Sequence, residues 1–134
     1  MSLDRVLEQS MQSVPECIAA AYVDMSTGLL LSVTAVGSYD RSHFEFVAAK
    51  TADIFQGPSI VAIEKMWKQY RKQPLDDRHF FQEMMIVSEN MLHMFIRCKR
   101  NNDHAVVFIT RKDANIGMVI AKSRASIPQL EAAV

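Results

Sequence analysis

The stretch FFQEMMIVSENMLHMFIRCKRNNDHAVVFIT, residues 80–110, decides the fold of this chain. It contains three short apolar segments, each about as long as an ordinary β-strand: residues 80–87, 91–98 and 105–110. The first two are separated by Glu89 and Asn90, and asparagine tolerates the positive φ angle that a tight hairpin turn requires. The polar residues 99–103 favour a second turn. The stretch therefore predicts an antiparallel meander of three strands.

The second and third segments are apolar on both faces of the strands that they predict. Successive side chains of a strand point to opposite faces, so a sheet exposed to water on one side alternates apolar and polar residues. Leu92, Met94 and Ile96 share one face of the second segment, and Phe95 is apolar on the other. Residues 105–109 are apolar throughout. We therefore expect helices to cover both faces of the sheet.

The first segment has the composition of an edge strand. Gln82, Glu83 and Ser88 interrupt its apolar residues, which suits the edge of a sheet better than its centre. An edge strand leaves a row of backbone N–H and C=O groups unpaired. A second copy of the same strand, related by a two-fold axis, would pair with these groups and extend the sheet across two chains.

The rest of the chain predicts two more strands and three helices, one of which is split. The expected strands cover residues 17–23 and 29–36. The expected helices cover residues 3–14, 42–55, 59–72 and 113–127. Ser2, Ser42 and Asp113 are the expected N-caps of these helices. Gly57 and Pro58 split the second helix, because glycine is unfavourable inside a helix and proline suits a first turn.

The order of these elements is helix, strand, strand, split helix, strand, strand, strand, helix. This order predicts an α+β domain in which a five-stranded antiparallel sheet has helices on both faces. At 134 residues, of which 49% are hydrophobic, the chain is expected to form a single ordered domain over residues 1–134. Its 15 Lys and Arg balance 15 Asp and Glu, which gives no basis for a nucleic-acid or anionic-membrane partner.

The two cysteines, Cys17 and Cys98, lie far apart in the sequence, within apolar segments. We expect buried free thiols rather than a disulfide, which predicts a location in the reducing cytoplasm. No apolar run approaches the about 18 residues that span a bilayer, so no membrane insertion is expected.

The sequence contains no recognisable catalytic motif. Phosphate-binding glycine loops, paired Cys-x-x-Cys motifs and His-Glu-x-x-His motifs are all missing from it. Its histidines, His43, His79, His93 and His104, are dispersed rather than spaced as metal ligands. We therefore predict a protein that is not an enzyme and has no catalytic residue, no metal and no cofactor.

Two sets of residues favour association with another protein. The first contains large side chains of kinds enriched at interfaces: Met66, Trp67, Tyr70 and Phe81. The second is basic: Lys65, Lys68, Arg71 and Lys72. Each has an alternative interpretation, because Trp67 could anchor the split helix on its own sheet and the basic residues could form a solvated face.

Two motifs give the chain a family resemblance. Residues 14–24, VPECIAAAYVD, are followed by Thr27-Gly28-Leu29-Leu30-Leu31, and residues 114–119 are ANIGMV. These motifs, in this order, resemble the first hairpin and the opening of the last helix of the Roadblock/dynein light chain family. The resemblance extends from about residue 3 to residue 127, and the chain departs from it at Gly57 and Pro58.

The resemblance implies a profilin-like Roadblock architecture and a homodimer joined through the third strand and the second helix. It also implies a non-catalytic scaffold that binds and regulates a small Ras-like GTPase near the second helices. The residues at the corresponding positions of the dimer interface are Phe81, Glu83, Met84, Met85, Ile86 and Val87, with Phe44 and Val47. The expected partner-binding residues are Lys65, Trp67, Lys68 and Arg71.

A second hypothesis is a small-molecule-sensing or general scaffolding module of related helix–sheet architecture. A sensor of this kind needs a concave, partly polar cavity between a helix and the sheet.

Overall fold

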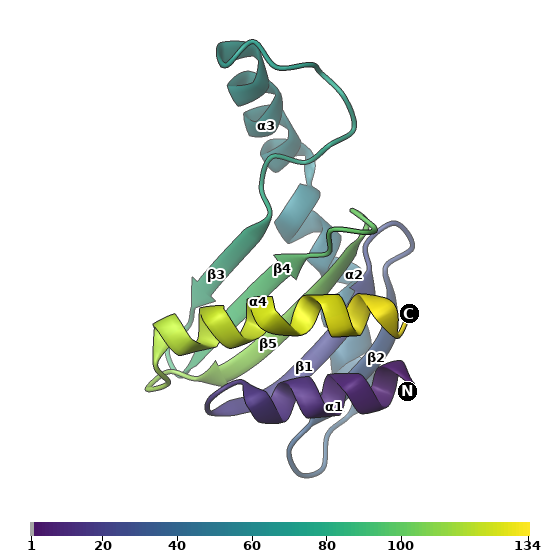
Figure 1. Ribbon diagram of the computed structural model, residues 1–134, viewed down its shortest axis with the longest axis vertical. Coiled ribbons are helices and arrows are strands. Elements are labelled where there is room, and N and C mark those ends of the chain that lie inside the picture. Colours follow the sequence, from purple (N-terminus) through teal and green to yellow (C-terminus); the bar gives the residue numbers. More distant parts are fainter. Residues whose placement is uncertain (1) are drawn as a thin grey trace.

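A five-stranded antiparallel sheet forms the centre of the structure, a computed structural model that describes residues 2–134 (Figure 1). Its strands are β1 (Cys17–Asp24), β2 (Leu29–Ala35), β3 (Glu83–Val87), β4 (Met91–Arg97) and β5 (His104–Arg111). The helices are α1 (Leu3–Ser13), α2 (Arg41–Gln56), α3 (Pro58–Tyr70) and α4 (Ile116–Ala132). The strand order is β2-β1-β5-β4-β3, so β3 lies at an edge as expected. The predicted fold class and element order are confirmed.

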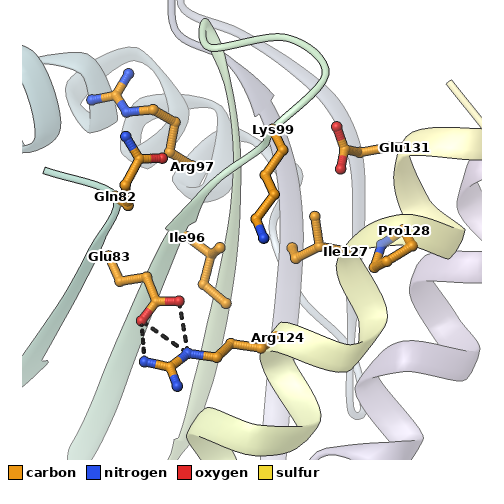
Figure 2. Close-up of a pocket in the computed structure, with 9 residues that line it drawn as sticks. All are labelled: Gln82, Glu83, Ile96, Arg97, Lys99, Arg124, Ile127, Pro128 and Glu131. Carbon is orange, nitrogen blue, oxygen red and sulfur yellow. Dashed lines mark hydrogen bonds and ion pairs between the residues drawn. The ribbon is translucent and has the colours of Figure 1, made fainter. Parts of the chain in front are cut away.

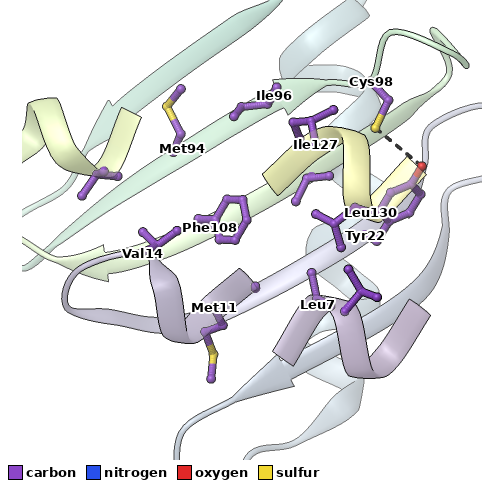
Figure 3. Close-up of a cluster of buried hydrophobic side chains, with 14 of the residues drawn as sticks. Leu7, Met11, Val14, Tyr22, Met94, Ile96, Cys98, Phe108, Ile127 and Leu130 are labelled. Carbon is purple, nitrogen blue, oxygen red and sulfur yellow. Dashed lines mark hydrogen bonds between the residues drawn. The ribbon is translucent and has the colours of Figure 1, made fainter. Parts of the chain in front are cut away.

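Helices cover both faces of this sheet, as the apolar pattern of β4 and β5 predicted. Helices α1 and α4 lie side by side on one face, where Leu7, Phe108 and Leu130 belong to the larger core cluster (Figures 1 and 3). Helix α2 lies on the other face, where Phe55 and Phe95 belong to a smaller cluster. Each fully buried side chain of this size contributes about 2 kcal/mol by leaving water.

Short polar side chains begin the helices, although two of the predicted caps were wrong. The Ser2 hydroxyl accepts a hydrogen bond from the Arg5 N–H, as expected. Helix α2 is capped by Asp40, whose carboxylate accepts from the Ser42 N–H and hydroxyl at 2.9 and 2.7 Å. Helix α4 is capped by Asn115 and not by Asp113. In both cases several short polar residues precede the helix, and residue type alone does not distinguish among them.

The edge strand β3 is shorter than predicted. It begins at Glu83 instead of residue 80, because the backbone N–H groups of Phe80 and Phe81 donate to Glu64 of α3. The turn after β3 also differs from the prediction. Asn90 does not have a positive φ angle; among non-glycine residues of the described chain, only Glu16 and Lys72 do.

Helix α4 extends beyond residue 127, where the sequence predicted its end. Pro128 lies inside the helix and removes one backbone hydrogen bond. The helix continues to Ala132 because Ile127 and Leu130, 4% and 0% exposed, anchor its last turns in the core.

The split between α2 and α3 occurs at Gly57 and Pro58, as predicted. A Cβ atom on Gly57 would lie 2.5 Å from the Asp53 carbonyl oxygen, so any other residue would collide with the last turn of α2. Pro58 occupies the first turn of α3, where its missing N–H costs nothing. Helix α3 and the loop after it project beyond the end of the sheet (Figure 1).

Candidate docking surfaces

The two edges of the sheet differ in regularity. At the β2 edge the register shifts opposite Tyr22 and Val23, which leaves Leu31 without a paired residue. Bulges of this kind disturb an edge and discourage pairing with another chain. Strand β3 pairs with β4 without interruption from Glu83 to Val87, and no strand formed by residues 2–134 pairs with its outer side. Strand β3 is therefore the edge better suited to accept a further strand.

The backbone groups that β3 presents outward follow from its hydrogen bonds to β4. The Arg97 N–H donates to the Gln82 carbonyl at 2.8 Å, and the Ser88 N–H donates to the Met91 carbonyl at 2.9 Å. In an antiparallel pair the bonded residues alternate along the strand, so residues 84 and 86 also face β4. The N–H and C=O groups of residues 83, 85 and 87 consequently point away from the sheet.

Most of the predicted dimer residues lie on this edge. Met84 and Ile86 are on the α2 face of the sheet, while Met85 and Val87 are on the α4 face. Ile86 and Val87 remain 42% and 56% exposed. Glu83 is held by the Arg124 guanidinium at 2.7 Å. Phe81, just before the strand, is half-buried.

Phe44 and Val47, the other predicted dimer residues, do not adjoin β3 within one chain. They lie in the first half of α2, a helix that packs on β2 and β1 at the opposite side of the sheet. The Phe44 ring meets Tyr39 edge to face at 5.5 Å, and Val47 is 36% exposed. The structure thus separates the predicted interface into the β3 edge and a part of α2.

Helix α3 has an unusual distribution of polar and apolar residues. Its buried residues are the charged Glu64 and Lys68, which are 3% and 8% exposed. The residues with large exposed apolar surfaces are Ile63, Met66, Trp67 and Tyr70. The charged side of the helix faces the loop of residues 71–82, and the apolar side faces solvent. We call α3 together with this loop the arm.

Glu64 fastens the loop to α3. Its carboxylate accepts hydrogen bonds from the backbone N–H groups of Phe80 and Phe81 and pairs with His79 Nδ1 at 3.0 Å. Burial alone would raise the pKa of the Glu64 carboxyl, but the hydrogen bonds from His79, Phe81 and Phe80 outweigh it and hold that pKa below its ordinary value. Glu64 is therefore a buried anion whose partners lie 15 to 17 residues later in the chain.

Lys68 fastens the other half of the loop. Its ammonium donates to the Asp76 carboxylate and carbonyl at 3.3 Å and to the Arg78 carbonyl. The interpretation of this lysine as part of a solvated face is therefore wrong. Since its donors are engaged within the chain, Lys68 does not belong to the exposed partner surface that the sequence suggested.

The other three predicted partner-binding residues are exposed on the arm. Trp67 retains 41% of its surface, and its ring meets Tyr70 edge to face at 5.7 Å. This exposure does not fit a tryptophan that serves only as a buried anchor. Lys65 and Arg71 are also exposed, and the one acidic residue of α3, Glu64, is buried. The exposed side of α3 and its C-terminal end therefore present positive charge around an apolar centre.

Arg97 connects the arm to the sheet, and the sequence did not predict this role. Although 1% exposed, its guanidinium donates to the carbonyls of Phe81 and Asn102 at 3.1 and 2.7 Å and to Gln56 Oε1 at 2.5 Å. It also lies over the Phe55 ring, 4.6 Å from its centroid. Burial lowers the pKa of Arg97 from its ordinary value. The sequence signal that could have indicated this role is that Arg97 shares a face of its predicted strand with Phe95, which was expected to be covered by a helix.

The described residues show neither an activated thiol nor a cluster of metal ligands. Cys17 and Cys98 are free thiols, and burial raises the pKa of each to about 11, which keeps them protonated at neutral pH. Residues 2–134 contain no group of three His, Cys, Asp or Glu side chains able to hold a metal. Over the same residues, none of the helices has the length and apolar character needed to cross a bilayer.

Glu64→Gln is expected to loosen the loop of the arm without unfolding the sheet. Glutamine keeps the shape but loses the charge that accepts the Phe80 and Phe81 N–H groups. We expect amide hydrogen exchange at these two residues to accelerate about thirtyfold, equivalent to about 2 kcal/mol. The matched control is Glu89→Gln, an exposed glutamate, which should leave both rates unchanged.

The same contacts predict a pH dependence of the arm. Because the pKa of Glu64 is lowered, the stability that it contributes is complete above its ordinary pKa and is lost as the pH falls through the lowered value. The Phe80 and Phe81 amide resonances should therefore move together on acidification in the natural protein and remain still in Glu64→Gln. Equal movement in both proteins would contradict this assignment.

Comparisons with known proteins identify the fold. No protein-family model matches the sequence, and no curated protein matches it significantly. Among solved structures, a Roadblock/LC7 domain from Streptomyces avermitilis is similar, with a TM-score of 0.69 and 12% identity over 98% of this chain and 97% of the other. The gliding protein MglB of Thermus thermophilus has a TM-score of 0.73 and 16% identity over 98% and 87%. Schizosaccharomyces pombe profilin has a TM-score of 0.59 and 13% identity, over 98% of both chains.

Proposed function

We propose that this chain, which has the profilin-like fold of Roadblock/LC7 domains, is a cytoplasmic, non-catalytic homodimer that binds and regulates a small Ras-like GTPase. The observation that carries the proposal is the regular, uncovered edge of β3 in a chain of this fold. The expectation of a GTPase partner comes from the family resemblance of the sequence, and the likeness to MglB agrees with it at the level of fold.

The β3 edge supports the homodimer. Residues 83, 85 and 87 present unpaired backbone groups, and two such edges related by a two-fold axis satisfy one another. Ile86 and Val87 add apolar surface, while the charge of Glu83 is already balanced by Arg124. Two chains would then form one sheet of ten strands, with both α2 helices on the same face.

The arm supports the binding of another protein. Trp67 and Tyr70 are large, exposed aromatic residues of the kind that dominate binding energies at interfaces. Lys65 and Arg71 flank them and favour a partner with an acidic surface. The arm holds this arrangement before binding, because Glu64 and Lys68 fix the loop to α3, and less ordering is then required on association. Regulation of the GTPase would follow from positioning the GTPase's own residues.

Trp67→Ala is expected to weaken GTPase binding about thirtyfold, the loss typical of removing a central aromatic residue from an interface. The measurement is calorimetric titration of the dimer with a Ras-like GTPase from the same organism, loaded in turn with GDP and a non-hydrolysable GTP analogue. Leu29→Ala is the matched control, since this large apolar residue is 59% exposed but begins β2, outside the arm. Equal affinities for the two variants would overturn the role of the arm and leave the dimer untouched.

A further inference from the structure

A depression of about 270 Å³ lies between α4 and the neighbouring ends of β3 and β4 (Figure 2). It is on the face of the sheet covered by α1 and α4, whereas α2 lies on the opposite face. It is formed within one chain and includes no residue of α3. Glu83 of β3 also lines it, so the depression lies beside the proposed dimer edge but apart from the exposed side of α3.

The floor of the depression is apolar. Ile96 of β4 and Ile127 of α4, each 4% exposed, form it together with the Pro128 ring. Pro128 also adds a polar feature, because it has no N–H to donate to the carbonyl four residues earlier, that of Arg124. The apolar floor favours a ligand with a hydrocarbon body.

The charged groups around this floor differ in how they are engaged. The Arg124 guanidinium binds both carboxylate oxygens of Glu83, at 2.7 to 3.1 Å. Glu131 accepts a hydrogen bond from the Arg100 N–H. The Lys99 ammonium points between Ile96 and Ile127 in Figure 2, and none of the ion pairs formed by residues 2–134 includes it.

We propose that this depression binds a small monocarboxylate with a short apolar chain. The carboxylate would pair with the Lys99 ammonium, and the chain would lie on Ile96, Ile127 and Pro128. A volume of about 270 Å³ is at the small end of ligand pockets, which limits the ligand to a short chain. A primary amine fits less well, since Glu83 and Glu131 already have partners. Phosphate fits less well, because the guanidinium groups of Arg97 and Arg124, which also line the depression, already donate to groups of the chain.

Three probes of matched structure test the proposal. Hexanoate has both the charge and the apolar chain, hexanol has only the chain, and acetate has only the charge. With the full-length protein, hexanoate should give saturable shifts of the Ile96 and Ile127 methyl resonances. Hexanol and acetate should each bind at least about tenfold more weakly, because each lacks one of the two contacts.

Lys99→Gln should weaken hexanoate binding about tenfold and leave hexanol binding unchanged. Lys122→Gln is the control, since Lys122 is exposed on α4 but does not line the depression. The proposal is overturned if hexanoate gives no saturable shift, if acetate binds equally well, or if Lys99→Gln and Lys122→Gln have the same affinity. The titrations require no GTPase, and repeating them below and above the dissociation constant of the homodimer separates ligand binding from dimerisation.

Discussion

Val87→Pro is expected to raise the dissociation constant of the homodimer about a hundredfold while the chain remains folded. The N–H of Val87 points away from β4, so proline removes a donor to the second chain without breaking the internal ladder. The side chain is 56% exposed, and little packing is lost. Removing a strand hydrogen bond and introducing the bulk of the ring costs about 1.5 kcal/mol in each chain, and two-fold symmetry doubles this to about 3 kcal/mol, which is on the order of a hundredfold.

Sedimentation over a range of micromolar concentrations gives the measurement. Val87→Thr is the control, because threonine retains the N–H and the branched shape, and it should dimerise like the natural chain. The free energies of unfolding of the two variants, measured by thermal unfolding at concentrations where each is monomeric, should agree within about 1 kcal/mol. A natural chain that sediments as a single copy at these concentrations would refute the dimer. An unchanged dissociation constant for Val87→Pro would refute pairing through β3.

Arg97→Met is expected to lower the free energy of unfolding by about 4 kcal/mol. Methionine fills the space of the aliphatic stem but leaves the Phe81 and Asn102 carbonyls and the Gln56 side chain without their donor. Each buried polar group left unsatisfied costs about 1 to 3 kcal/mol. These acceptors belong to α2, to the residue pair before β3 and to the turn after β4. Loss of their common donor therefore affects the arm and the sheet together.

Urea unfolding of the monomeric Val87→Pro background separates this effect from dimerisation. Arg97→Lys should lose about half as much, since one ammonium reaches fewer acceptors than the branched guanidinium. Arg100→Met, at an exposed position three residues later, should change the stability by less than about 0.5 kcal/mol. A loss below about 1 kcal/mol for Arg97→Met would mean that water satisfies these acceptors and that Arg97 is not structurally required.

The sequence predicted the features that depend on local periodicity. Apolar residues on both faces of segments 91–98 and 105–110 indicated a sheet covered on both faces, and the polar interruptions Gln82 and Glu83 indicated the edge. These predictions succeed because a residue's side of a strand is set by its neighbours in the chain. The chosen caps Ser42 and Asp113 failed because neighbouring Asp40 and Asn115 have equal chemistry.

The sequence did not predict which side of α3 faces solvent. The sequence identified Met66, Trp67 and Tyr70 as side chains typical of interfaces, but helical periodicity does not say whether the side of the helix that carries them is covered. Here it is exposed, because Glu64 and Lys68 obtain their partners from a loop that follows the helix. The burial of Arg97 depends in the same way on acceptors distant in sequence, and no local pattern reveals them.

The contacts of the arm determine which residues of the chain can be substituted without disturbing the sheet. Glu64 and Lys68 fasten the loop to its own helix, and Gly57, where a larger residue would collide with Asp53, lies just before the arm. The outer residues of α3 contribute nothing to the core, so they are free to vary while the sheet and its edge are kept. A designer could exchange residues 59–79 between related chains as a cassette and redirect the choice of partner, provided that Arg97 and the Phe81 carbonyl remain to receive it.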